Sequence, residues 1–206
     1  MRAKDLREAI ALANATGYGL TSGLETLDDR EQADWLAGIR AGNLYVNRVT
    51  TGAIVLRQPF GGFGKSAFGP GIKAGGPNYV AQLMDFEEGG EPAGSAATED
   101  DRLRVLQDAL LEGPADLPAH DASRLVTAIA SYDKNVREEF GTEHDHFRLV
   151  GQDNLRGYLP VRELRVRVHP DDTVFEIFAR VCAARAVGCR VTVSVPPQPS
   201  PRRSIG

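Results

Sequence analysis

The residues of this chain whose types and spacing could bind an anion lie in one glycine-rich run, Gln58–Pro70. Its Gly64-Lys65-Ser66 triplet has the ending of a phosphate-binding loop, which needs a further glycine five positions before Gly64. Pro59 stands there, and proline has a fixed φ and no backbone N–H to donate to a phosphate. A nucleotide hydrolase is therefore disfavoured, and we expect a shaped loop that contacts a ligand or a partner chain.

Two other chemistries are poorly supported by the sequence. Gly62, Gly64 and Ala67 have the spacing of a dinucleotide-binding turn, but glycines and a proline follow them in place of an amphipathic helix. Cys182 lies in an apolar helical pattern, and Cys189 lies beside a helix-ending glycine. Both are predicted to be buried, unactivated thiols. We therefore expect no catalytic nucleophile in this chain.

Histidines and lysines offer weaker candidates. His144 and His146 flank Asp145 on a predicted loop and could bind a metal, but two histidines this close are more often solvated. Lys65 and Lys73 flank glycine turns and could meet a substrate carboxylate or a partner chain. For both lysines a solvated role is the favoured interpretation, and no metal site is predicted.

Composition sets the outer limits. The chain has 206 residues, 42% hydrophobic and 25% charged, with a net charge of −4, which is typical of a globular protein without a dominant nucleic-acid surface. No apolar run approaches the length of a membrane span. The N-terminus is charged and lacks a signal peptide, and two cysteines cannot form a disulfide framework. A cytoplasmic location is expected.

Hydrophobic periodicity predicts an α/β protein in two parts. Residues 1–86 form the first part, residues 87–100 an acidic flexible linker, and residues 101–206 the second part. The first part should contain helices at 6–14 and 28–39, the latter capped by Asp28 or Asp29, and strands at 19–24 and 43–47. The second should contain helices at 101–111, 123–140 and 173–186, the last capped by Asp171 or Asp172, and strands at 164–168 and 190–195. The strand–helix–strand order at the end predicts a parallel βαβ unit.

Three motifs in the first part resemble the C-terminal end of the aldehyde dehydrogenase catalytic domain. They are Ala13–Leu24, Ala41–Asn47 and Pro59–Gly62, in order and with matching spacing. The stretches Thr50–Gly62 and Lys65–Tyr79 are similar to the L-glutamate γ-semialdehyde (1-pyrroline-5-carboxylate) dehydrogenase branch, especially the module of bacterial bifunctional proline-oxidising flavoproteins. The resemblance covers residues 5–85.

The resemblance implies NAD-dependent oxidation of glutamate γ-semialdehyde to glutamate. On matching positions, Gly52 and Ala53 would lie in the loop that anchors the substrate α-carboxylate through backbone N–H groups, a sensible chemistry for consecutive small residues. Phe60 would pack against the aliphatic part of the substrate. The alternatives are that Gly52-Ala53 is only a turn and Phe60 only a core residue; the surrounding motif disfavours both.

The same resemblance implies what this chain lacks. The family's thiolate nucleophile, general-base glutamate and cofactor-binding turn all lie upstream of the matched part, so no catalytic or cofactor-binding residue is assigned. We therefore expect a C-terminal fragment from a truncated or split reading frame, inactive alone and in need of the missing N-terminal part or a dehydrogenase partner. Gly151–Pro160 and the βαβ unit look like the non-catalytic, aldehyde-dehydrogenase-like assembly region of long proline-catabolic enzymes. A non-catalytic module that covers or completes a partner dehydrogenase is the competing hypothesis.

Overall fold

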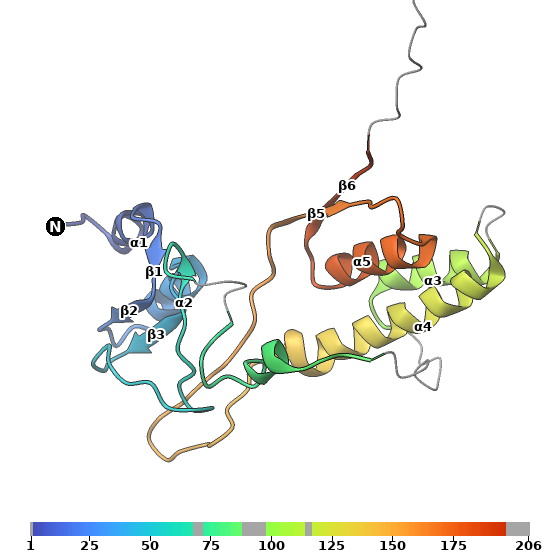
Figure 1. The fold of residues 1–206 in the computed structure, drawn as a ribbon. Helices are drawn as coiled ribbons and strands as arrows, with labels where there is room; N and C mark the ends of the chain where they lie inside the picture. The colour runs from blue at the N-terminus through green and yellow to red at the C-terminus, as the bar shows by residue number, and fades with distance from the viewer. Residues whose placement is uncertain (1, 68–71, 88–97, 114–116, 197–206) are drawn as a thin grey trace, which may run out of the picture. The chain divides into compact units, whose positions relative to one another are not determined.

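The computed structural model describes residues 2–67, 72–87, 98–113 and 117–196, and these fall into two compact units (Figure 1). The first unit comprises Met1–Glu87 with Asp145–Asn154, and the second comprises Glu88–His144 with Leu155–Gly206. Most of the predicted linker at 87–100 lies outside the described residues. None of the helices found in the described ranges is long and apolar enough to cross a membrane.

The first unit begins with two helices that the sequence predicts. α1 (Leu6–Ala15) and α2 (Asp29–Gly38) each follow an aspartate, Asp5 and Asp28 respectively, whose carboxylate accepts a hydrogen bond from a backbone N–H of the first turn. Such caps satisfy donors that the helix itself leaves unpaired. Of the two candidate caps for α2, Asp28 is the correct one.

A parallel strand pair carries the core of the first unit. β2 (Thr21–Leu24) pairs in parallel with β3 (Asn43–Val46), and α2 connects them. Trp35 and Ile39, at the end of α2, are buried with Tyr45 of β3. This β–α–β arrangement and its counterpart in the second unit confirm the predicted α/β class.

The prediction of one continuous strand at 19–24 is wrong, because its first residues belong to another pair. β1 (Tyr18–Gly19) pairs antiparallel with β4 (Phe63–Gly64), so part of the glycine-rich run is itself a strand. A Cβ atom on Gly19 would lie 2.0 Å from the Arg40 carbonyl oxygen, and the Gly19 carbonyl accepts a 3.0 Å hydrogen bond from the Gly42 N–H. The two backbone segments approach too closely here for a residue with a side chain. A pattern of alternating apolar residues does not reveal such a contact. A 3₁₀ turn, η1 (Val80–Leu83), follows the run.

Three helices form the core of the second unit (Figure 1). α3 (Asp101–Leu111) and α5 (Val174–Ala186) both pack against α4 (Ala119–Asn135). The buried side chains of this core are Leu103, Leu110, Leu125, Val126, Ile129, Ala179, Cys182 and Ala186. α4 starts earlier than predicted, directly after Pro118, and continues into a π-helical turn, η2 (Val136–Phe140).

The predicted parallel βαβ unit is confirmed. β5 (Glu163–Arg167) pairs in parallel with β6 (Arg190–Ser194), and α5 connects them. Both candidate caps of α5 are wrong, since Thr173 caps it and forms a reciprocal capping box with Glu176. The Asp172 carboxylate instead accepts a 2.7 Å hydrogen bond from the His169 N–H and pairs with Arg180.

The end of the predicted linker is part of the helical unit. Thr98 is buried, and the backbone N–H groups of Glu99 and Asp100 donate to the Asp133 carboxylate of α4 at 2.9 and 3.2 Å. Composition suggested that the second part begins at residue 101. The contacts of residues 98–100 show that the folded part of the second unit begins before it.

Candidate substrate-anchoring site

The three predicted site residues lie on either side of one tight turn. Ile54 and Gln58 exchange two backbone hydrogen bonds, of 3.2 and 2.7 Å, in an antiparallel bridge. This bridge brings the segment before it, with Gly52 and Ala53, and the segment after it, with Phe60, to the same end of the turn. The predicted anchor therefore directly precedes this bridge, and the predicted apolar wall follows it two residues after Gln58.

The carbonyl of Gly52 is held in one direction by two donors. The Tyr45 hydroxyl donates to it at 3.0 Å, and the Gln58 amide nitrogen donates at 3.1 Å. The Gln58 amide is assigned in the orientation that makes both of its contacts hydrogen bonds. Gly52 has a φ of 111°, a conformation that favours glycine.

The backbone donors of this turn are available to a ligand. Thr51, Gly52 and Ala53 are exposed residues, and their N–H groups donate to no acceptor among the described residues. Because the peptide is planar and trans, the Ala53 N–H points opposite to the Gly52 carbonyl. Successive N–H groups that point outward can bind an anion.

Phe60 is held by its backbone on two sides. It exchanges hydrogen bonds of 2.9 and 3.0 Å with Ala74, and the Asn43 side chain contacts the residues that flank it. The Asn43 amide nitrogen donates to the Pro59 carbonyl at 2.9 Å, and its oxygen accepts from the Gly61 N–H at 3.2 Å. The position of the half-buried Phe60 ring is thus set by fixed backbone on each side.

One face of strand β3 positions both halves of the site. Asn43 and Tyr45 are two residues apart, so their side chains project on the same side of the strand. The first holds the peptides around Phe60, and the second holds the Gly52 carbonyl. The sequence predicts a buried strand here but not this role. The signal that could have indicated it is the polar Asn43 and the aromatic Tyr45 at alternate positions of the strand.

Lys73 is not solvated, so that prediction is wrong. Its ammonium group donates to the Gly61 carbonyl at 3.0 Å, to the Asn43 amide oxygen at 3.2 Å, and to the Gly42 carbonyl. Burial lowers its pKa from 10.5 to about 8. Lys73 therefore links the start of β3 to the turn that carries Phe60. Lys65, by contrast, is exposed as expected.

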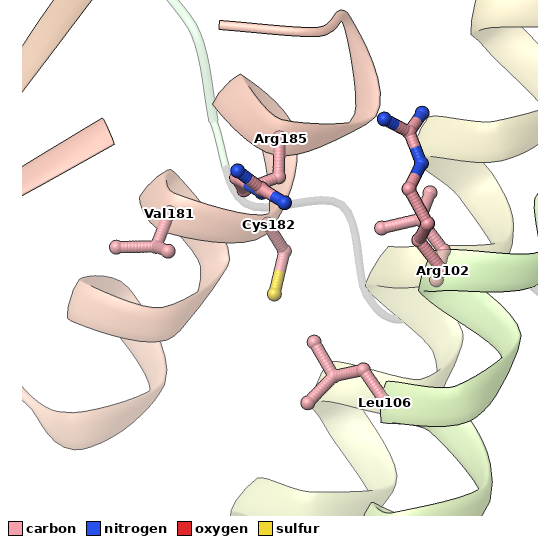
Figure 2. Close-up of a pocket in the computed structure, with 6 residues that line it drawn as sticks. Arg102, Leu106, Val181, Cys182 and Arg185 are labelled. Carbon is pink, nitrogen blue, oxygen red and sulfur yellow. The ribbon is translucent and has the colours of Figure 1, made fainter. Parts of the chain in front are cut away.

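Neither cysteine has the surroundings of a nucleophile. Cys182 and Cys189 are free thiols with 2% and 4% of their surface exposed, and burial raises the pKa of Cys182. Figure 2 shows the Cys182 side chain between α5 and α3, near Leu106. It borders a cavity of about 220 Å³ with an apolar lining and two arginines, Arg102 and Arg185. The predicted burial of both thiols is confirmed.

The two candidate metal-binding histidines, His144 and His146, both interact with other groups of the protein. The His144 imidazole lies 3.2 Å from the Glu139 carboxylate and 3.0 Å from the Thr142 hydroxyl. In the described ranges, no three His, Cys, Asp or Glu side chains are grouped so that they could hold a metal ion.

Comparison with known proteins identifies the class of the first unit. Residues 1–88 match the model of the aldehyde dehydrogenase family. The resemblance that three motifs indicated is therefore confirmed.

Particular relatives narrow the class. The bifunctional protein PutA of Rhizobium meliloti is 52% identical over 83 residues, which are 40% of this chain and 7% of that protein. The 1-pyrroline-5-carboxylate dehydrogenase of Bacillus cereus is 48% identical over 83 residues, or 40% of this chain and 16% of that enzyme.

Two matches extend into the second unit. PutA of Klebsiella aerogenes is 33% identical over 192 residues, 91% of this chain and 14% of that protein. The solved structure of proline utilization A (PutA) from Corynebacterium freiburgense covers 98% of this chain with a TM-score of 0.73 and 35% identity. The chain spans 21% of that structure, so it corresponds to a small part of each relative.

Proposed function

We propose that this chain is the C-terminal part of an NAD-dependent L-glutamate γ-semialdehyde dehydrogenase, which converts the semialdehyde to glutamate in proline degradation. In this proposal the chain supplies the substrate-anchoring turn and not the nucleophile. One observation carries it: the N–H groups of Gly52 and Ala53, which have no acceptor among the described residues, lie at the same end of a turn as Phe60. The similarity to a PutA protein and to a 1-pyrroline-5-carboxylate dehydrogenase supports this choice of substrate.

Each candidate residue has a role in this chemistry. The N–H groups of Gly52 and Ala53 would bind the α-carboxylate, and the ring of Phe60 would pack against the methylene groups of the semialdehyde. Oxidation of an aldehyde through a thiohemiacetal requires an accessible thiolate, and both cysteines here are buried. The nucleophile, the base and the groups that bind NAD would therefore come from a further segment or a partner dehydrogenase. The free thiols fit the cytoplasmic compartment that we propose.

Reconstitution of activity tests this function. The purified chain alone, mixed with glutamate γ-semialdehyde and NAD, is expected to give no NADH absorbance. Co-expression with a Rhizobium meliloti PutA shortened by the residues that match this chain should restore NADH formation, and the same PutA alone should not. Turnover by the chain alone would contradict the missing nucleophile, and an inactive pair that co-purifies would contradict the anchoring role.

A non-catalytic assembly module is the second candidate. The observation that favours it is the β5–β6 pair, a two-stranded parallel sheet whose Leu164 and Val193 are 40% and 47% exposed. Parallel sheets are usually covered on both faces, so such a pair is suited to being covered by a partner. Co-purification with a complete semialdehyde dehydrogenase, without any change in its turnover when Gly52 is replaced, would favour this candidate over the first.

A further inference from the structure

We propose that Arg48, Gln58 and Tyr45 form a relay of hydrogen-bond donors that fixes the direction of the Gly52–Ala53 peptide. By fixing it, they determine that the turn binds carboxylates. The inference rests on the proposed function and adds to it three positioning residues that act through the peptide, not by touching the substrate.

The relay begins at Arg48, which imposes the orientation of the Gln58 amide. A guanidinium group has only donors, so the atom of Gln58 that faces it must be the amide oxygen. That oxygen accepts from Arg48 at 2.7 Å, which turns the amide nitrogen toward the Gly52 carbonyl, 3.1 Å away. Arg48 thus converts Gln58, a residue that could donate or accept, into a donor.

Tyr45 supplies the second donor and holds Arg48 in place. Its hydroxyl lies 3.0 Å from the Gly52 carbonyl oxygen, and its ring is buried in the core. The Arg48 guanidinium lies 5.4 Å from the centre of that ring, a cation–π distance. The carbonyl therefore receives two hydrogen bonds from side chains whose own positions are constrained.

The polarity of this peptide decides which ligand the turn accepts. With the Gly52 carbonyl held by two donors, the Ala53 N–H faces away from them and toward a ligand. A reversed peptide would leave both donors without their acceptor and would present a carbonyl oxygen, which repels a carboxylate. Among the residues that the structure describes, no carboxylate forms an ion pair with Arg48.

The variant Gln58→Glu tests the hydrogen bond to the Gly52 carbonyl separately from the stability of the fold. A glutamate keeps the shape and pairs with Arg48, but it has only acceptors and cannot donate to the Gly52 carbonyl. Arg48→Met removes the orienting group, and Tyr45→Phe removes the second donor. Gln82→Glu is the matched control, because Gln82 is exposed and, among the described residues, its side chain bonds only to Tyr79 in its own turn.

The test is a titration of the full ¹⁵N-labelled chain followed by amide NMR. L-Glutamate and acetate should shift the Gly52 and Ala53 amide signals of the wild type and of Gln82→Glu, and the uncharged isostere acetamide should not. Each relay variant should bind glutamate about fivefold more weakly, the equivalent of one net hydrogen bond of about 1 kcal/mol. The dispersion of the remaining signals reports folding in every variant.

The outcomes separate the two proposals. If glutamate leaves the wild-type Gly52 and Ala53 signals unmoved, the anchoring role fails and the relay fails with it. If the wild type binds and all three relay variants bind equally well, only the relay is overturned. If one variant loses its dispersed spectrum, the other two still decide, because they alter different atoms of the relay.

Discussion

The side chain of Asn43 hydrogen-bonds to the backbone on both sides of Phe60, to the Pro59 carbonyl at 2.9 Å and to the Gly61 N–H at 3.2 Å. A strand residue thus holds the peptides that determine where an aromatic ring in a separate turn is placed. This arrangement explains how the segment 59–62, where glycines offer little side-chain packing, can keep one conformation.

Replacing Asn43 with alanine should destabilise the first unit. Two part-buried backbone groups would lose their partners, at a cost of about 2 kcal/mol for two net hydrogen bonds. Trp35 is the only tryptophan of the chain and is 3% exposed, so its fluorescence during urea denaturation reports this unit. Gln82→Ala is the control, because Gln82 is an exposed residue of the same unit whose amide donates to the Tyr79 carbonyl in its own turn. Equal unfolding midpoints for the two variants would contradict the role of Asn43.

Lys73 should make the stability of the first unit depend on alkaline pH. Burial lowers its pKa to about 8, below the ordinary 10.5, so the folded state binds this proton less tightly than the unfolded state. The free energy of unfolding contributed by this group should therefore rise as pH increases from 8 toward 10.5. Below pH 8 the lysine is charged in both states and the slope vanishes.

The difference between the wild type and Lys73→Met isolates this effect from tyrosine and cysteine titration. Urea midpoints followed by Trp35 fluorescence at pH 7, 8, 9 and 9.5 should diverge above pH 8. Only the wild type should gain stability there, because Lys73 loses its proton more readily in the folded state. Parallel curves for the two proteins over this range would show that Lys73 keeps its ordinary pKa. Lys65→Met, at an exposed position, should run parallel to the wild type.

Helix α5 provides a direct comparison of predicted and observed caps. Thr173→Ala removes the side chain that accepts the Glu176 N–H at 3.2 Å, and the loss of such a cap costs about 1 kcal/mol. Asp171→Ala changes the neighbouring candidate, whose side chain is 90% exposed, and should stay within about 0.5 kcal/mol of the wild type. Urea denaturation followed by far-UV circular dichroism measures both, and the reverse order would make Asp171 the cap.

The sequence predicts elements well where a local pattern determines them. Helical spacing and Asp28 place α2 correctly, and alternation places β5 and β6 in a parallel unit. Local pattern fails at α5, where three cap residues follow one another and only the capping box with Glu176 selects Thr173. The choice depends on the backbone angles of each residue, which composition does not encode.

The candidate site shows the same limit over a longer distance. Family motifs indicate Gly52, Ala53 and Phe60, but not the residues that hold them. Lys73 and Asn43 are 30 positions apart, and their contact depends on the tertiary structure, which places Lys73 beside the start of β3. A lysine beside glycines is usually solvated, so nothing local indicates a buried ammonium group.

Asp133 should make the second unit sensitive to acid. Burial acts to raise the pKa of its carboxyl, but the Glu99 and Asp100 N–H groups and the Arg137 guanidinium outweigh it and hold the pKa below its ordinary value. A lowered folded-state pKa means that the stabilisation is complete above about pH 5 and is lost as pH falls toward the folded-state pKa.

Asp133→Asn should therefore destabilise the second unit by about 2 kcal/mol near pH 7, because hydrogen bonds to a charged acceptor are the stronger kind. The gap between the two proteins should close below pH 3.8, the ordinary value of the carboxyl, as the wild type takes up its proton. Far-UV circular dichroism during urea denaturation at pH 7, 5, 4 and 3 measures the gap. The matched control is Asp108→Asn, at an exposed position of α3, which should follow the wild type at every pH. A gap for Asp133→Asn that stays constant down to pH 3 would mean that the amide loses packing alone and that the carboxylate charge is not what holds residues 98–100 to α4.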